Sequence, residues 1–193
     1  RYLDCHKLAI LASDFFLSEN SVVVDIGSTT GTFAEKLGQF HKTKNKLNIK
    51  CVEIENHFCN FAAKRLEKSG LLSIHNIEVL NEDINLLEMD PESIDMFTSF
   101  FTLQFIRPKL RAKLLANIYK SLNWGGGLIL FEKLRGSDAR FQDILNHMLN
   151  MEKISTNFTP EEIFAKTISL AGKMEPFSDK GNRQILQKAG FVD

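Results

Sequence analysis

One stretch near the N-terminus constrains the fold of this chain more than any other. Residues 22–26 read Val-Val-Val-Asp-Ile, an apolar and largely β-branched run that is typical of a strand buried on both faces of a parallel sheet. A turn with Gly27 and Gly31 follows, and helical spacing begins at once with Phe33 and Leu37. Strand, glycine turn and helix predict the first half of a nucleotide-binding βαβ unit, because glycines let a ligand approach the backbone and a helix start offers N–H groups to an anion.

The turn argues against two common phosphate-binding motifs. A dinucleotide fingerprint needs G-x-G-x-x-G, and from Gly27 this chain reads Gly27-x-Thr29-x-x-Thr32. A P-loop needs Gly-Lys-Ser or Gly-Lys-Thr, and neither follows. What remains, Asp25-x-Gly27-x-x-x-Gly31, resembles the first motif of class I S-adenosylmethionine-dependent methyltransferases, D-x-G-x-G-x-G. It departs from that motif at the middle glycine, where Thr29 stands, and an ordinary strand-to-helix turn is the alternative interpretation.

Length and composition limit the class of protein. A chain of 193 residues, of which 25% are charged, is expected to form a single globular domain over residues 1–193. No apolar run reaches ~18 residues, so no membrane-spanning helix is predicted. The 24 basic and 24 acidic residues balance, whereas a non-specific nucleic-acid binder carries a basic excess. The three cysteines lack C-x-x-C spacing, which predicts reduced thiols, no metal site and a cytoplasmic location.

Strands and helices alternate along the first two-thirds of the chain. This alternation predicts an α/β fold, namely a mostly parallel, Rossmann-like class I methyltransferase sheet with helices on both faces. Strands are expected over 21–26, 49–55, 77–80, 93–99 and 128–131, with a turn over 123–127. Helices are expected over 3–17 (burying Leu8, Leu11, Ala12 and Phe15), over 31–40, after strand two (burying Phe58, Phe61, Ala62 and Leu66) and from Pro108.

From residue 136 onward the pattern is helical only. Thr159 and Glu162 form a capping box that opens a helix to about Leu170. Because five strands are predicted where class I methyltransferases have seven, and no initiator methionine is present, we expect a fragment that lacks residues at both ends and strands six and seven. The helices of residues 136–175 are expected to form a lid over an acceptor. Core packing is the alternative for their apolar residues Met148, Met151, Phe158 and Phe164.

Polar groups follow three successive predicted strands. The turn Gly27–Ser28–Thr29 suits the carboxylate and ammonium of the methionine end of S-adenosylmethionine. Glu55, or alternatively Glu53, would accept both ribose hydroxyls, and Asp83 would accept the adenine amine. Because the carboxyl ends of parallel strands meet at one edge of a sheet, these groups are expected to lie together. A plain surface carboxylate for Glu55 and a turn former for Asp83 are the alternatives.

A longer resemblance begins at Phe101–Phe105, which reads Phe-Thr-Leu-Gln-Phe. With Tyr119, Leu122–Asn123, Gly125–Gly126 and Glu132–Lys133 after it, the chain resembles the carboxy-S-adenosylmethionine synthases, a branch of class I methyltransferases tied to wobble-uridine modification of tRNA. The resemblance runs without a gap to residue 191. It implies a homodimer and leaves the acceptor open between a small molecule and a tRNA-linked group.

The resemblance also implies binding residues. The family's cofactor-contacting tyrosine falls on Tyr2, its ribose pair on Glu55–Asn56 and its adenine pair on Asp83–Ile84, while an asparagine near the methionine end is replaced by Phe100. His57, His147 and Glu132 are conceivable bases, but we assign no catalytic residue, since methyl transfer mainly needs alignment. The predicted cofactor-binding set is Tyr2, Asp25, Gly27, Ser28, Thr29, Gly31, Glu55, Asn56, Asp83, Ile84 and Phe100.

One departure from the family decides the predicted reaction. Where the family has Lys-Arg, and the arginine grips the extra carboxylate of the carboxylated cofactor, this chain has Lys166–Thr167. Without a guanidinium the bidentate grip is lost. The sequence therefore favours a methyltransferase that uses plain S-adenosylmethionine. The alternatives are a carboxy-S-adenosylmethionine synthase in which Lys166 or Arg183 replaces the arginine, and a non-catalytic cofactor-fold module that binds a partner.

Overall fold

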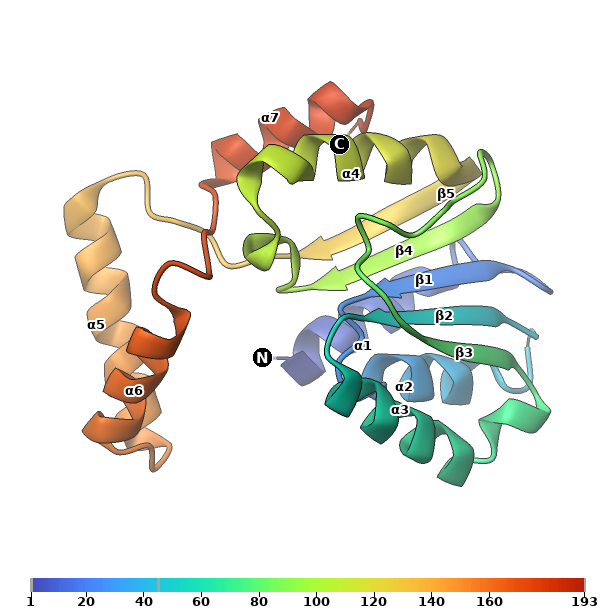
Figure 1. Cartoon of the computed structure of the whole chain (residues 1–193), viewed down its shortest axis with the longest axis horizontal. Helices are drawn as coiled ribbons and strands as arrows, with labels where there is room; N and C mark the ends of the chain where they lie inside the picture. The colour runs from blue at the N-terminus through green and yellow to red at the C-terminus, as the bar shows by residue number, and fades with distance from the viewer. Residues whose placement is uncertain (1, 45, 193) are drawn as a thin grey trace.

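The protein is built around a five-stranded parallel sheet, seen in a computed structural model that describes residues 2–44 and 46–192 (Figure 1). The strand order is β3-β2-β1-β4-β5, so the order reverses between β1 and β4. In open α/β sheets such a reversal opens a crevice at the carboxyl ends of the strands. The strands are β1 (Val22–Ile26), β2 (Asn48–Glu53), β3 (Asn76–Asn81), β4 (Ile94–Phe100) and β5 (Leu122–Phe131).

Helices cover both faces of this sheet, as the alternating sequence pattern predicted (Figure 1). One face carries α1 (Tyr2–Ser13), α2 (Thr32–His41) and α3 (Asn56–Lys68). The other carries α4 (Pro108–Ser121) and α7 (Asp179–Ala189). Two short 3-10 turns, Leu71–Ser73 and Leu103–Phe105, complete the core domain. The predicted α/β fold is confirmed.

The β-branched run of β1 explains why the sheet can be buried on both sides. Val23 belongs to one apolar cluster, which includes Phe33 and Met96, whereas Val24 belongs to the other, which includes Phe97 and residues of α4. Val23 and Val24 are both 0% exposed. Successive side chains of a strand point to opposite faces, so only a run without polar interruption fills both clusters.

A helical hairpin stands apart from the sheet, and we call it the arm. It consists of α5 (Ala139–Ser155) and α6 (Pro160–Leu170), and it projects on the side to which the strand ends point (Figure 1). The predicted capping box is present, with Thr159 and Glu162 bonded to each other's backbone N–H groups. No described residue of α5 is buried, and Met148 is 62% exposed. Met151, Phe158 and Phe164 are also exposed, so core packing is the wrong interpretation of these four residues.

The sequence pattern predicted the wrong buried face for α1. Leu8, Leu11 and Phe15, which were expected to be buried, are 59%, 53% and 87% exposed. The helix ends at Ser13, whose buried hydroxyl lies 2.8 Å from Nε2 of His41 on α2. This polar contact fixes which side of α1 faces α2, and Ala9 and Ile10 are buried instead.

Two further expectations are corrected. Phe61 of α3 is 53% exposed, and the buried residues of that helix are Cys59, Ala62 and Leu66. Residues 123–127 are not a turn before the fifth strand but part of β5, which begins at Leu122. Gly125 has a φ of 81° and the pairing with β4 shifts register between Ile94 and Met96, so the glycines form an irregular strand start. Among the described helices, none has the length and apolarity needed to cross a membrane.

Candidate cofactor cleft and arm root

A cleft of about 540 Å³ lies at the strand ends where the strand order reverses. Residues that follow β1, β2, β3 and β4 all line it. Of the predicted cofactor-binding residues, the structure brings together Gly27, Thr29, Glu55, Asp83, Ile84 and Phe100. Asp25, Ser28, Gly31 and Asn56 do not line the cleft, and the side chain of Tyr2 lies outside the described residues.

The glycine turn is closed against the loop after β4. Gly27 has a φ of 69°, and its N–H donates to the carbonyl oxygen of Val52 at 2.9 Å. A Cβ at this position would lie only 2.6 Å from Cγ2 of Thr102. Position 27 therefore needs glycine for two reasons, its backbone conformation and the close approach of Thr102.

The next residue of interest, Thr29, adopts a conformation that its side chain disfavours. Its φ is 47°, in the left-handed region that β-branched residues rarely occupy. Its N–H donates to Oε2 of Glu53 at 2.9 Å, while Oε1 of Glu53 accepts the N–H of Glu55 at 3.0 Å. Glu53 is thus engaged in holding the turn, whereas the Glu55 side chain is 63% exposed.

Three of the residues outside the lining have supporting positions. Asp25 is 1% exposed and accepts a hydrogen bond from the Thr98 hydroxyl at 2.8 Å, and its burial raises its pKa to about 7. A Cβ added to Gly31 would lie 3.1 Å from Cβ of Ala62, so this glycine allows α2 to pack on α3. Ser28 is buried, and its N–H donates to Val52. These residues shape the turn without reaching the cleft.

The segment after β3 lines another part of the cleft. Oδ1 of Asp83 accepts both the backbone N–H of Asn85 at 2.9 Å and its side-chain amide at 2.7 Å. Ile84 is 7% exposed and contributes an apolar surface. Asp83 therefore has the turn role that was its alternative interpretation, and it also lines the cleft.

The wall after β4 was missed as a binding element. Residues 101–106, which we call the cofactor loop, contribute Phe101, Thr102, Phe105 and Ile106 to it, and Arg107 and Leu110 complete it. Phe101 has a φ of 59°, a strained value for an aromatic residue, and Phe105 is 47% exposed. The Phe-Thr-Leu-Gln-Phe segment was part of the family resemblance, but its residue types do not by themselves indicate contact with a ligand.

Phe100 lies at the boundary between cleft and core. It is 8% exposed, and its ring stacks on that of Phe131 at 5.6 Å between centroids. His6 lies edge-on to the same ring at 4.5 Å. Phe100 therefore gives this part of the cleft an apolar surface.

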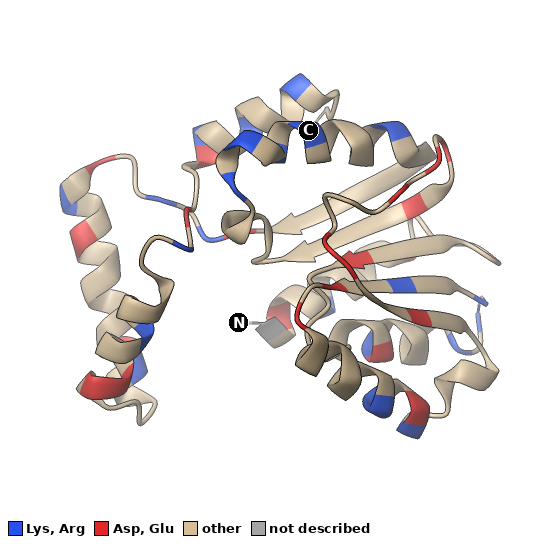
Figure 2. Cartoon of the chain, in the orientation of Figure 1, with Lys and Arg blue, Asp and Glu red and all other residues tan. Residues whose placement is uncertain are grey.

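The charge of the cleft suits a cationic ligand. Glu53, Glu55, Glu82 and Asp83 line it, against one arginine, Arg107. Figure 2 shows acidic segments in the long loop between β3 and β4. S-adenosylmethionine carries a sulfonium and an ammonium, and opposite charges at short range stabilise each other. Phe58 and Phe101 add apolar surface for a purine ring. The residues present therefore fit this cofactor in charge and in apolar surface.

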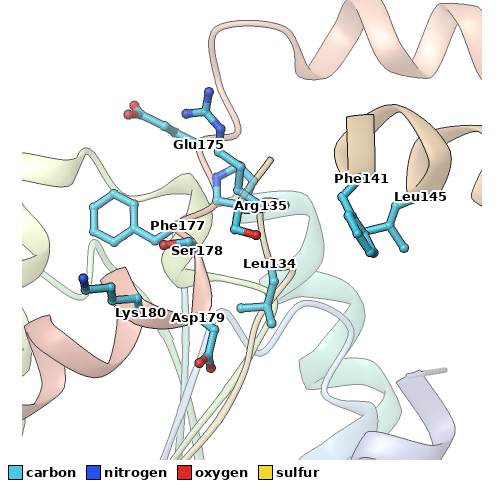
Figure 3. Close-up of a pocket in the computed structure, with 12 residues that line it drawn as sticks. Leu134, Arg135, Phe141, Leu145, Glu175, Phe177, Ser178, Asp179 and Lys180 are labelled. Atoms are coloured by element: carbon cyan, nitrogen blue, oxygen red, sulfur yellow. The ribbon is translucent and has the colours of Figure 1, made fainter. Parts of the chain in front are cut away.

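A second cavity, of about 850 Å³, lies where the chain enters and leaves the arm (Figure 3). We call residues 134–137 and 175–178 the arm root. Phe141 and Leu145 of α5 stand on one side of the cavity and Phe177 on the other (Figure 3). Arg135 and Lys180 line it together with Glu175 and Asp179, so charges of both signs surround an apolar centre.

The three conceivable bases, His57, His147 and Glu132, differ in their exposure and in their contacts. His57 is exposed and lies 3.8 Å from the carboxylate of Glu55, and His147 is exposed on the arm. Glu132 follows β5, and its oxygens accept the N–H groups of Leu103 and Gln104 at 2.9 and 3.0 Å. Burial raises the pKa of Glu132 to about 7. Its hydrogen bonds give it a structural position, so no base is assigned.

The fold and the cleft define an α/β protein of the methyltransferase class. A family model described as "Methyltransferase domain" matches residues 23–126. The YcgJ protein of Bacillus subtilis superposes with a TM-score of 0.69 over 98% of this chain and 68% of its own, at 13% identity. A phosphoethanolamine N-methyltransferase of Haemonchus contortus, solved with S-adenosylhomocysteine, gives a TM-score of 0.66 at 20% identity, covering 96% of this chain and 36% of its own.

The sequence relatives narrow this class. A carboxy-S-adenosyl-L-methionine synthase of Staphylococcus epidermidis is 33% identical over 193 residues, which are 100% of this chain and 80% of that protein. The synthase of Trichodesmium erythraeum is 31% identical over 88% of this chain and 64% of its own length. The chain belongs to the methyltransferase-domain family and, within it, to the family of these synthases. It is an enzyme of the S-adenosylmethionine-dependent methyltransferase class, and its cofactor is S-adenosylmethionine.

Proposed function

We propose that this enzyme moves the methyl group of plain S-adenosylmethionine to an acceptor bound between the cofactor cleft and the arm root. The observation that carries the proposal is the charge of the cleft, in which the carboxylates of Glu53, Glu55, Glu82 and Asp83 outnumber the single Arg107. A further carboxylate on the cofactor would be repelled here, whereas the sulfonium of the plain cofactor is favoured. We also propose that the predicted cofactor-binding residues that line this cleft contact the cofactor. These are Gly27, Thr29, Glu55, Asp83, Ile84 and Phe100.

The absence of a carboxylate grip supports the plain cofactor. Thr167 takes the place of the family's arginine, and its hydroxyl donates to the carbonyl oxygen of Ile163 at 2.9 Å within α6. Of the two possible replacements, Lys166 lies on the arm, and Arg183 pairs with Asp179 at 3.1 Å on α7. Neither is among the residues that line the cleft.

A synthase reaction is the second candidate, and the 33% identity to the Staphylococcus epidermidis protein favours it. It would require a cation to approach the cleft from the arm or from another subunit. A second copy is part of this proposal, because the arm leaves Phe141, Ile144 and Phe164 exposed on the described surface. The three free cysteines support a reducing, cytoplasmic location.

The arm is proposed to act as a lid of a single domain. Its root borders the 850 Å³ cavity, which is large enough for a small acceptor and open enough for a tRNA-linked one. The mixed charges of Arg135, Lys180, Glu175 and Asp179 give this cavity polar groups at its rim. We therefore keep both acceptor types in the test.

Calorimetry with S-adenosylmethionine and its carboxylated form, on wild type and Glu55→Gln, tests the proposal. The proposal is supported if the wild type binds the plain form with higher affinity than the carboxylated form. In Glu55→Gln the affinity for the plain form should fall about 10-fold, because a charge-assisted hydrogen bond is lost. Preference for the carboxylated form would make the synthase the better assignment. Binding of neither by the folded protein would leave only a non-catalytic module. Methyl transfer to small-molecule and tRNA substrates then separates the acceptor types.

A further inference from the structure

Two side chains outside the cofactor cleft hold the cofactor loop and the arm root together. They are Arg111 of α4 and Glu132, the residue after β5. Neither lines the cleft, and the sequence indicated no role for Arg111 and only that of a conceivable base for Glu132. Their hydrogen bonds run to two segments that lie far apart in the chain but adjacent in space, residues 101–106 and residues 175–177.

Glu132 fixes the middle of the cofactor loop. Its two oxygens accept the successive N–H groups of Leu103 and Gln104 at 2.9 and 3.0 Å. The residues on either side of this pair, Thr102 and Phe105, line the cofactor cleft. A carboxylate that accepts two adjacent backbone N–H groups allows only one position of the loop, because both bonds depend on the same orientation.

Arg111 binds both segments at once. The residue is 1% exposed, and its Nε donates to the carbonyl oxygen of Ile106 at 2.8 Å. Its Nη2 donates to the carbonyl oxygens of Gln104 at 3.2 Å and Glu175 at 2.7 Å. The guanidinium also lies 4.3 Å from the ring centroid of Phe177 at the arm root. A buried guanidinium with these partners cannot release one segment without losing contacts to the other.

The connection is completed by a direct hydrogen bond. The N–H of Glu175 donates to the carbonyl oxygen of Gln104 at 2.8 Å. The peptide groups of Gln104 are therefore bonded on one side to Glu132 and on the other to Arg111 and the arm root. Any shift of the cofactor loop that widens or narrows the cleft must move Gln104, and with it residues 175–177.

We propose that Arg111 and Glu132 are positioning residues that couple occupancy of the cofactor cleft to the position of the arm. Cofactor binding against Thr102 and Phe105 then orders the arm root, and by reciprocity a ligand that orders the arm root raises affinity for the cofactor. The proposal rests on cofactor binding at this cleft and does not depend on which acceptor the enzyme uses.

Hydrogen exchange with and without S-adenosylmethionine tests the coupling. In the wild type, S-adenosylmethionine is expected to slow exchange in residues 101–106 and also in residues 173–178. Arg111→Lys keeps the charge but cannot reach three carbonyl oxygens from one fork. In this variant protection is expected to remain in residues 101–106 and to be lost in residues 173–178, while the dissociation constant rises about 5- to 10-fold.

Glu132→Gln is the second variant, since it keeps the side-chain size and replaces one acceptor with a donor. Because its hydrogen bonds run to Leu103 and Gln104 of the cofactor loop, protection by S-adenosylmethionine is expected to weaken in residues 101–106 and with it in residues 173–178, even if Arg111→Lys fails to fold. Lys113→Gln, an exposed change on the same helix, should match the wild type. Protection confined to residues 101–106 in the wild type, or arm protection retained in both variants, would overturn the coupling alone. A wild type that binds no S-adenosylmethionine would overturn the proposed function as well.

Discussion

The carboxylate of Glu53 accepts the backbone N–H of Thr29 at 2.9 Å, and this side-chain contact joins the end of β2 to the glycine turn after β1. Thr29 stands where the related motif has its middle glycine, and its φ of 47° is left-handed. A non-glycine residue in this region costs roughly 1–2 kcal/mol. The hydrogen bond from Glu53 offsets part of that cost, so the chain retains the glycine-type turn without the glycine.

Thr29→Gly should therefore stabilise the protein. Glycine removes the left-handed strain but adds roughly 0.5–1 kcal/mol of backbone entropy to the unfolded chain. We expect a net rise of about 0.5 kcal/mol in the free energy of unfolding, measured by urea denaturation. Thr30→Gly is the matched control, since the φ of Thr30 is not positive, and it should lower stability. Equal effects of the two changes would contradict the strain argument.

The two acidic residues after Val52 should separate into a structural and a binding role. Glu53→Gln loses one of two backbone N–H acceptors and should lower the free energy of unfolding by about 1–2 kcal/mol. Glu55→Gln changes an exposed side chain and should leave stability within about 0.5 kcal/mol while weakening S-adenosylmethionine binding. Denaturation and calorimetry on the same two samples test this. The reverse pattern would show that Glu53 meets the ribose.

The close approach of Gly27 and Thr102 gives a third prediction. Gly27→Ala places a methyl group against the Thr102 side chain and forces alanine into a φ of 69°. We expect a loss of about 2–3 kcal/mol in stability and a strong loss of cofactor affinity. Adding Thr102→Ala removes the contact but not the backbone strain, so roughly half of the lost stability should return. No recovery at all would mean that backbone strain alone accounts for the loss.

The fold and most of the cleft were predictable because they depend on local pattern. The run at residues 22–26 can fill two apolar clusters only as a central strand, and strand ends at one sheet edge place Glu55 and Asp83 beside Gly27. The face of α1 was not predictable in the same way. Its orientation depends on the contact of Ser13 with His41, a pair far apart in sequence that no periodicity reveals.

The roles of Glu53 and of the cofactor loop were hidden for a related reason. Both depend on backbone N–H and carbonyl groups, which every residue carries and which leave no trace in residue type. Glu53 and Glu55 are the same residue type, and their roles differ only because the Thr29 N–H lies beside the Glu53 carboxylate. Arg111 reads as a charged helix residue, although it is the largest fully buried side chain among the described residues.

Asp25 gives a prediction about pH. Burial raises the pKa of its carboxyl from 3.8 to about 7, with a hydrogen bond from Thr98 acting against this shift and the nearby Glu53 adding to it. Between pH 4 and 7 the folded state holds a proton that the unfolded chain has lost, so this group's contribution to stability falls as pH rises through that window. Cys51 on β2 is paired with Asp25 in the sheet, and burial raises the pKa of the Cys51 thiol, so this thiol stays neutral between pH 4 and 7.

Asp25→Asn should remove this dependence, because the amide oxygen still accepts the Thr98 hydroxyl and no proton can be lost. We expect the variant to exceed the wild type by about 1–3 kcal/mol in free energy of unfolding at pH 8 and to lose most of that advantage at pH 4. His6, whose pKa burial lowers to about 4, destabilises both proteins in acid and cancels in the difference. Urea denaturation of both proteins from pH 4 to 8 measures it. A difference that stays constant across this range would show that Asp25 is already ionised in the folded protein at pH 4.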